Sequence, residues 1–258
     1  MNLGLEGRRA LVTAAGRGLG RSIALCLARE GAHVAVVARS AGDVARVVEE
    51  MGGAGEGHRG LTLDLALEGA PRRLADDLAQ TGFDPIDIVV HNLGGTLDVT
   101  DPYCSIDDWR RVWRVNVEVA VELNLLLMPS MRERAWGRIV HVSSTSAAEN
   151  QGPVTYCAAK AALTAYARSL GRVLAPEGIV VTAVLPGAVF TDGGYWDTAS
   201  RERPEHVTKY LAERMAIRRF GRPDEIGEVV TFLCSEHASF CVGSVVPIDG
   251  GQGRTFFQ

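Results

Sequence analysis

The sequence has almost no lysine. All but two of its 27 basic side chains are arginine, the exceptions being Lys160 and Lys209, and 31 acidic side chains give a formal net charge of −4. Nucleic acids and anionic membranes bind clustered positive charge, so this balance argues against both as partners. Arginines do gather at 110–114 and 132–138, but carboxylates interrupt them, and we interpret both stretches as solvated helix faces.

Cysteine is also scarce, and the five cysteines form no C-x-x-C pair. An odd number without close pairs argues against a disulfide framework or a zinc site, so we predict a reducing compartment and no metal. The N-terminal stretch lacks a signal-type apolar core, and no apolar run reaches membrane-spanning length. These absences together predict a soluble, cytoplasmic protein.

Short β-branched runs alternate with amphipathic segments, the pattern of βαβ units and a parallel sheet. We expect a single α/β domain over 1–258, a Rossmann-type doubly wound sheet of about seven strands flanked by helices. The expected strands are 8–13, 33–38, 61–64, 87–91, 138–142, 179–184 and 245–248. Helices are expected at 18–29, 43–51, after Pro71, and at 106–131, 154–174 and 223–234. Residues 187–215 break the rhythm with paired glycines and aromatics, which predicts a flap.

Lys160 lies four residues after Tyr156 in the predicted helix 154–174. Positions i and i+4 share a helix face, so the ammonium and the phenol can point into the same space. A neighbouring ammonium favours the phenolate, and the spacing therefore predicts a tyrosine of lowered pKa that acts as acid or base. Arginine would hold its protons too firmly for that task. A chance surface pair is the competing interpretation of this motif alone.

A glycine-rich loop, Thr13-Ala14-Ala15-Gly16-Arg17-Gly18-Leu19-Gly20, joins the first predicted strand to the first helix. Glycines allow a sharp turn and close approach to a phosphate, and the helix N-terminus adds its positive dipole end. A dinucleotide site at this loop is the favoured interpretation, and a βα turn without a ligand is the alternative.

The second predicted strand ends in Ala38-Arg39-Ser40, where an NAD-binding chain usually places an acid. Arg39 and Arg17 can instead hold a 2′-phosphate, which favours NADP(H), with NAD(H) and an ordinary exposed arginine as the alternatives. Asp64 ends the third predicted strand and is a candidate contact for the adenine amino group, although an Asp that caps the βα turn fits equally well.

In their order and spacing these features resemble the classical short-chain dehydrogenase/reductase family over essentially the whole chain. Residues 13–20 are similar to its T-G-x-x-x-G-x-G loop, 91–94 (H-N-L-G) to its N-N-A-G, and 156–160 to its Y-x-x-x-K. Further matches are Ser144, Asn116, Pro186-Gly187 with Thr191, and Asp249-Gly250-Gly251. Ala14 and His91 depart from the family pattern. Ser144 precedes the tyrosine by one residue less than is usual, so Ser143 is its fallback.

The resemblance implies a hydride transfer between the nicotinamide and a ketone or secondary alcohol. Tyr156 would be the general acid or base, Lys160 would hold the nicotinamide ribose, Ser144 would bind the substrate oxygen, and Asn116 would place a water. The cofactor half would cover about 1–145, and the catalytic and substrate half 146–258. The implied cofactor contacts are Thr13, Gly16, Arg17, Gly18, Leu19, Gly20, Arg39, Asp64, Leu65, Asn92, Gly94, Tyr156, Lys160, Pro186, Gly187, Val189 and Thr191. A homotetramer is also implied.

The predicted substrate contacts are Ser144, Thr96, Glu149, Asn150 and Trp196, which favour a polar, hydroxylated substrate. The nearest subgroup is the 3-oxoacyl-carrier-protein reductases, although Ala135 and Glu177 stand where carrier-protein readers tend to have basic residues. A sugar-like or polyol dehydrogenase that uses NAD is the alternative. A dinucleotide-binding protein without catalysis and an epimerase are the other classes considered. The intact Ser, Tyr, Lys and Asn argue against the first of these, and the short C-terminal part argues against the second.

Overall fold

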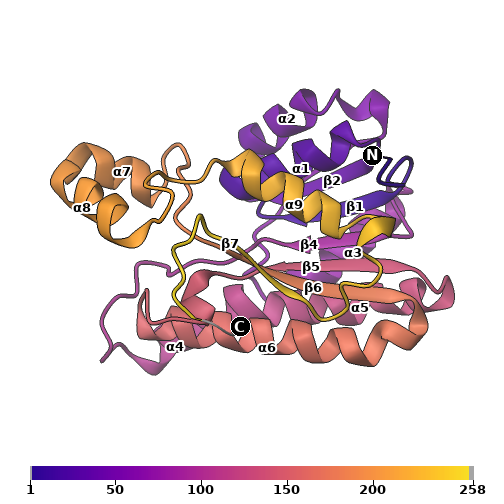
Figure 1. Ribbon diagram of the computed structural model, residues 1–258. Helices are drawn as coiled ribbons and strands as arrows, with labels where there is room; N and C mark the ends of the chain where they lie inside the picture. The colour runs from indigo at the N-terminus through magenta and orange to yellow at the C-terminus, as the bar shows by residue number, and fades with distance from the viewer. Residues whose placement is uncertain (1, 256–258) are drawn as a thin grey trace.

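Seven parallel strands form one sheet in the order β3-β2-β1-β4-β5-β6-β7, as seen in the computed structural model, which describes residues 2–255 (Figure 1). The strands are β1 (Arg9–Thr13), β2 (His33–Ala38), β3 (Arg59–Thr62), β4 (Ile88–His91), β5 (Gly137–Val142), β6 (Ile179–Pro186) and β7 (Val245–Ile248). The order reverses between β1 and β4, and the expected doubly wound Rossmann-type sheet is confirmed.

Helices cover both faces of the sheet. They are α1 (Gly18–Arg29), α2 (Ala41–Glu50), α3 (Ala70–Gln80), α4 (Ile106–Trp113), α5 (Val119–Glu133), α6 (Val154–Leu174), α7 (Tyr195–Glu202), α8 (Pro204–Arg214) and α9 (Pro223–Leu233). The apolar sides of α1, α2 and α9 pack on one face, and those of α3, α5 and α6 pack on the other. The central strands β4, β5 and β6 are buried along their whole length, as parallel strands covered on both sides must be.

Most expected boundaries agree with the structure within two residues, and two differences concern the site. The third strand ends at Thr62, so Asp64 lies in the loop beyond it. The predicted helix 106–131 is divided by a π-helical turn, Arg114–Glu118, where the backbone hydrogen bonds widen. The expected flap with short helices contains α7 and α8, which project away from the sheet (Figure 1).

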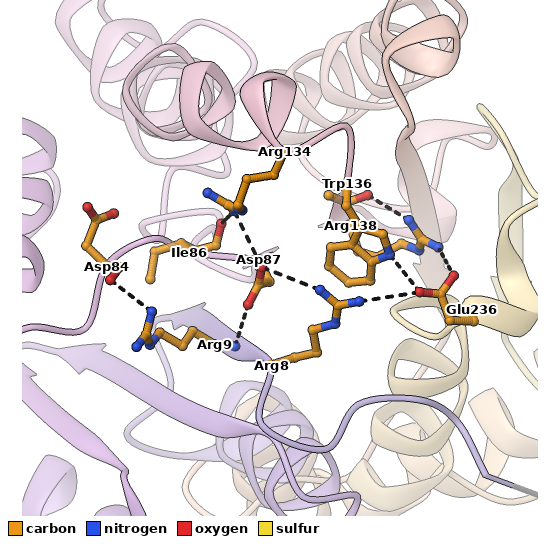
Figure 2. Close-up of polar contacts among 10 residues, drawn as sticks. Arg8, Arg9, Asp84, Ile86, Asp87, Arg134, Trp136, Arg138 and Glu236 are labelled. Atoms are coloured by element: carbon orange, nitrogen blue, oxygen red, sulfur yellow. Dashed lines mark hydrogen bonds and ion pairs between the residues drawn. The ribbon is translucent and has the colours of Figure 1, made fainter.

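A charged network closes the edge of the sheet at the start of β1, β4 and β5 (Figure 2). Arg8 lies 3.8 Å from Asp87 and 3.5 Å from Glu236, and it stacks 3.7 Å from the ring centroid of Trp136. Glu236 also pairs with the buried Arg138 at 3.1 Å and accepts a hydrogen bond from the Trp136 indole at 2.7 Å. These contacts tie the strand starts to the segment after α9, at the edge opposite the strand ends that carry the predicted site.

Two histidine rings stack on the face of the sheet that α5 and α6 cover. His91 on β4 and His141 on β5 have ring centroids 4.7 Å apart. His91 hydrogen-bonds Asn124 at 2.7 Å, whereas neither ring nitrogen of the buried His141 has a partner. Burial lowers the pKa of both rings, that of His91 to about 4, so both are neutral at neutral pH. His91, which departs from the family pattern, therefore packs as part of the core.

We expect His141→Phe to stabilise the protein by about 1–2 kcal/mol, because it removes two buried polar atoms without partners and keeps an aromatic ring beside His91. The matched variant His91→Phe leaves the side-chain oxygen of Asn124 without its His91 partner and should destabilise the fold. Urea unfolding at neutral pH measures both free energies. Equal destabilisation by the two variants would contradict this assignment.

None of the helices within residues 2–255 is long and apolar enough to cross a bilayer.

Candidate active site

A cleft of about 1350 Å³ opens at the carboxyl ends of the strands, where the sheet order reverses. Ligands of doubly wound folds bind at this kind of switch point. Many residues predicted for the cofactor and the catalytic pair line it: Gly16, Arg17, Gly18, Leu19, Arg39, Asp64, Leu65, Asn92, Gly94, Tyr156, Lys160, Gly187, Val189 and Thr191. The geometry thus brings residues from distant parts of the sequence to one space.

The glycine loop forms the floor of one end of the cleft. Gly18 begins α1 with φ +58°, and Ala14 takes φ +51°, which shows that alanine adopts the left-handed turn expected of the family's glycine. The Arg46 guanidinium donates to the carbonyl of Gly16 at 3.0 Å and so braces the loop from α2. The amide ends of α1 therefore face the cleft, as phosphate binding at a helix N-terminus requires.

Thr13 and Gly20 shape this loop from behind and do not line the cleft. The Thr13 hydroxyl accepts from the amides of Asn92 and Leu93 at 2.9 and 3.0 Å, joining β1 to the loop after β4. The side-chain amide of Asn92 donates to the backbone carbonyls of Thr13 and Ala14, both at 3.1 Å. A Cβ on Gly20 would lie 2.5 Å from Asn92 Nδ2, so only glycine fits there. The structure places these residues as supports for the loop.

Two arginines stand at the end of the cleft that the second strand reaches. Arg17 and Arg39 are both exposed and both line the cleft. The lining also contains the carboxylates Asp43, Asp64, Glu118 and Asp192, of which Asp43 is paired with Arg46 at 2.8 Å, so its charge is offset. This arrangement suits a phosphate, whose oxygens accept charged hydrogen bonds from guanidinium groups.

The loop after β3 forms the far wall. Asp64 lines the cleft while its carboxylate accepts from the amide of Ala66 at 3.0 Å, the turn-capping role that was the alternative for this residue. Arg114 donates to the carbonyl of Ala66 at 3.2 Å and ties this loop to the π-helical turn. Arg110, Arg111 and Arg114 also line the cleft; Arg110 and Arg111 are exposed, as expected of a solvated helix face, whereas Arg114 is half-buried.

Tyr156 and Lys160 lie together on α6, as their spacing predicts, with the Lys160 ammonium 5.7 Å from the phenol ring centroid. The ammonium is buried and donates to the carbonyl of Val142 at 2.9 Å. Both side chains reach the cleft. They are not a chance surface pair.

Ser144, and not its fallback Ser143, meets the tyrosine. Burial raises the pKa of the Tyr156 phenol, interaction with the Ser144 side chain opposes that rise, and the Ser144 hydroxyl accepts from the amide of Ser146 at 3.1 Å. Ser143, however, is the one of the two serines that lines the cleft. The Ser143 hydroxyl is instead engaged with α6, bonding the Lys160 carbonyl at 3.1 Å and the Thr164 hydroxyl at 2.8 Å. The geometry therefore favours Ser144 as the serine of the site.

Asn116 sits in the π-helical turn and is buried. Its side chain holds the loop after β4 by accepting from the amide of Gly95 at 3.1 Å and donating to the Gly95 carbonyl at 2.8 Å. A Cβ on Gly94 would lie 2.6 Å from Asn116 Oδ1 and 2.8 Å from Lys160 Nζ. Both polar atoms thus border the same small space at Gly94, and the wide turn brings Asn116 there.

The pKa of Tyr156 shifts in the direction opposite to the one that the sequence predicts. Burial raises the pKa of Tyr156, opposed by its hydrogen bond to Ser144, whereas the spacing predicted a pKa lowered by Lys160. Burial also lowers the pKa of Lys160 from its usual 10.5 to about 8. Desolvation by burial is the largest cause of both shifts, and neither group is among the causes of the other's shift. At neutral pH the phenol is protonated and the lysine is charged.

The predicted substrate contacts separate into two groups. Trp196 lines the cleft, and its ring also packs 4.3 Å from Tyr210 and 4.8 Å from Phe220, so it joins the flap's own aromatic cluster. Thr96, Glu149 and Asn150 do not line the cleft. Glu149 turns instead to the C-terminal segment, where it accepts from the amide of Arg254.

Several site residues were missed by sequence reasoning. Arg46 braces the glycine loop, and Gln252 reaches the loops on either side of the site from the C-terminal segment. The position of Gln252 directly after the Asp249-Gly250-Gly251 turn was the available signal. No group of three or more His, Cys, Asp or Glu within residues 2–255 is placed to hold a metal ion.

Comparison with known proteins places this geometry in a family. The model of a family described as Enoyl-(Acyl carrier protein) reductase matches residues 13–252. A 3-oxoacyl-[acyl-carrier-protein] reductase of Pseudomonas aeruginosa is 35% identical over 96% of this chain and 98% of its own length. Among solved structures, the L-sorbose reductase of Gluconobacter frateurii complexed with NADPH and L-sorbose has a TM-score of 0.91 at 29% identity, covering 99% and 100% of the two chains.

A 3-oxoacyl (acyl-carrier-protein) reductase from Agrobacterium tumefaciens with NADP bound has a TM-score of 0.86 at 31% identity, covering 96% of this chain and 95% of its own. The fold and the site define an oxidoreductase that uses a nicotinamide dinucleotide. The chain belongs to the short-chain dehydrogenase/reductase family and is similar to the 3-oxoacyl-carrier-protein reductases within it.

Proposed function

We propose that this protein is an NADPH-dependent reductase of a ketone, with Tyr156 as the proton donor. The observation that carries the proposal is that Tyr156 and the buried Lys160 lie together on α6 at the cleft, where burial keeps the phenol protonated. Reduction of a carbonyl needs a proton on the developing alkoxide, and a neutral phenol can deliver it. Bound NADPH supplies the hydride.

Ser144 and Tyr156 together bind the substrate oxygen. As negative charge builds on that oxygen, two fixed hydroxyl groups stabilise it without reorganising, which is where a site of this kind gains most of its rate. Ser144 keeps its orientation because its hydroxyl also accepts from the amide of Ser146. In the reverse direction the same tyrosine accepts the proton of the alcohol.

Lys160 holds positive charge next to the phenol and resupplies its proton. Its ammonium and Asn116 Oδ1 both pack against Gly94, where an added Cβ would lie 2.8 Å and 2.6 Å from them. A water bound by Asn116 links Lys160 to solvent and completes the relay. Lysine suits this role because its proton, unlike that of arginine, can leave at moderate pH.

NADPH is preferred over NADH because Arg17 and Arg39 face the cleft with the nearby Asp43 neutralised by Arg46. The glycine loop and the start of α1 fit a dinucleotide pyrophosphate. The NADP named with the solved structures of similar chains supports this choice.

Arg39→Asp should lower the ratio of kcat/KM with NADPH to kcat/KM with NADH by about 100-fold, because a charged hydrogen bond is replaced by repulsion. Arg172→Asp, on the exposed surface of α6 away from the cleft, is the matched control and should leave the ratio unchanged. Initial rates with both cofactors measure the effect. An unchanged ratio in Arg39→Asp would mean that another group selects the phosphate.

The substrate is a 3-oxoacyl thioester or a polyhydroxylated ketone. The relatives' names support the first class. Tyr195 and Trp196 at the cleft support the second, since flat aromatic faces suit the CH faces of sugars, as does the name of the sorbose reductase. Oxidation of NADPH by purified protein with a panel of both classes decides between them. No turnover with any ketone would sink the proposed function.

A homotetramer is part of this proposal, because α4 and α5 expose Ile106 (64%) and Leu125 (63%). We expect light scattering to give four times the mass of one chain at micromolar concentration. A monomer would contradict the assembly without affecting the chemistry.

A further inference from the structure

Gln252 is the polar side chain through which the C-terminal segment reaches the two loops that carry the proposed site. It is 3% exposed. Its Oε1 accepts from the amide of Ala188 at 2.7 Å, in the loop that follows β6 and bears Gly187 and Val189 of the cleft. Its Nε2 donates to the hydroxyl of Thr145 at 3.4 Å, directly after Ser144, and to the Gln151 amide oxygen.

The turn that precedes Gln252 aims it inward. Gly250 and Gly251 have φ of +61° and +75°, a conformation that glycine adopts readily. The Asp249 carboxylate accepts from the amides of Gly251 at 2.9 Å and Gly253 at 2.7 Å and locks the turn. We call the loop 187–189 after β6 the cofactor loop. A Cβ on Gly187 would lie 2.8 Å from Gln252 Oε1, so this loop and the side-chain amide of Gln252 pack tightly against each other.

The orientation of the amide is fixed by its partners. Ala188 offers a backbone N–H, which can only donate, so the oxygen of Gln252 must face it. The nitrogen then faces the Thr145 and Gln151 oxygens. One side of the amide therefore holds the cofactor loop, and the other side holds the turn of Ser144 and the loop that leads to Tyr156.

We propose that Gln252 is a positioning residue for catalysis: its oxygen sets the cofactor loop, and its NH₂ group sets Ser144 relative to Tyr156. The proposal rests on the proposed function, since it assigns Gln252 a part in that reaction. It touches neither the phenol nor, in this arrangement, the substrate oxygen. Small displacements of reacting groups lower rates strongly, so losing either hydrogen bond should be visible in kinetics.

Two substitutions separate the two sides of the amide. Gln252→Glu keeps the length and keeps an acceptor for Ala188, but it donates to Gln151 and Thr145 only while its carboxyl is protonated. Gln252→Met keeps the length and removes both functions. Gln80→Glu and Gln80→Met, at the exposed end of α3, are the matched controls. The assays are ketone reduction at a series of pH values, NADPH binding by fluorescence, and thermal unfolding.

For Gln252→Glu we expect kcat relative to wild type to fall about tenfold as pH rises through the pKa of the new carboxyl, which burial raises, with the Kd for NADPH within about twofold of wild type. For Gln252→Met we expect a loss of kcat of about tenfold at every pH and a several-fold weaker Kd for NADPH. A purely structural role would lower Tm in both variants without a new pH dependence of kcat.

A ratio of kcat for Gln252→Glu to wild type that does not change with pH, or wild-type kcat and Kd in Gln252→Met, would overturn the proposal. The proposed function is tested separately by whether the wild type reduces any ketone. If the wild type reduces no ketone, the Kd for NADPH of the two Gln252 variants still tests whether Gln252 positions the loop 187–189. Weaker binding in Gln252→Met alone supports the assignment to the cofactor loop, and equal binding in both variants overturns it.

Discussion

Tyr156→Phe should lower kcat for ketone reduction by about 1000-fold and leave the Kd for NADPH within about twofold of wild type. The variant removes one oxygen, which is the proposed proton donor and which interacts with Ser144. The ring that lines the cleft stays, so cofactor binding should persist. Steady-state rates and fluorescence titration with NADPH measure the two quantities on the same sample.

Tyr103→Phe is the control for this variant, because Tyr103 is 93% exposed and does not line the cleft. It should retain wild-type kcat. If Tyr156→Phe also retained it, a different acid would have to protonate the alkoxide, and the account of the site would be wrong.

Lys160→Met should lower kcat by about 100-fold or more and yet make the folded protein more stable at neutral pH. Burial lowers the pKa of Lys160 from 10.5 in the unfolded chain to about 8 in the fold. This difference corresponds to a penalty of up to about 3 kcal/mol for holding the charge inside, which an apolar side chain of similar length avoids. The lost bond to the Val142 carbonyl reduces the gain.

The stability gained by Lys160→Met should depend on pH. Below pH about 8 the lysine is charged in both states and the penalty is complete; between about 8 and 10.5 the unfolded chain holds the proton more tightly, so wild-type stability rises with pH. The advantage of Lys160→Met should therefore shrink across that window. Urea unfolding of both proteins at neutral and alkaline pH tests it, and a Lys160→Met protein less stable than wild type at neutral pH would contradict the buried-charge argument.

The sheet and most helix boundaries could be predicted because each rests on local pattern: buried strands such as β4 are continuous apolar runs, and α6 has its apolar residues at helical spacing. The pairing of Tyr156 with Lys160 follows from the same periodicity. Their proximity could be predicted, but the direction of the tyrosine pKa could not, because burial depends on packing from elements far apart in the sequence.

The residues that sequence reasoning misplaced depend on long-range contacts. Glu149 follows Ser144 closely in the sequence, yet its carboxylate accepts from the amide of Arg254, more than a hundred residues away. Gln252 was missed for the same reason, since its partners lie in the loops after β5 and β6. The π-helical turn at Asn116 also leaves no periodicity signal, because one widened turn barely shifts a helical pattern.

Deuterium transfer tests the central claim most directly. A ketone reduced by this protein is incubated with NADPH that carries deuterium at its transferable position, and the product is analysed by mass spectrometry. We expect an alcohol with one deuterium on its carbinol carbon from the wild type, and product formation about 1000-fold slower from Tyr156→Phe. An unlabelled alcohol, or wild-type rates from Tyr156→Phe, would contradict hydride transfer at a site where this tyrosine is the acid.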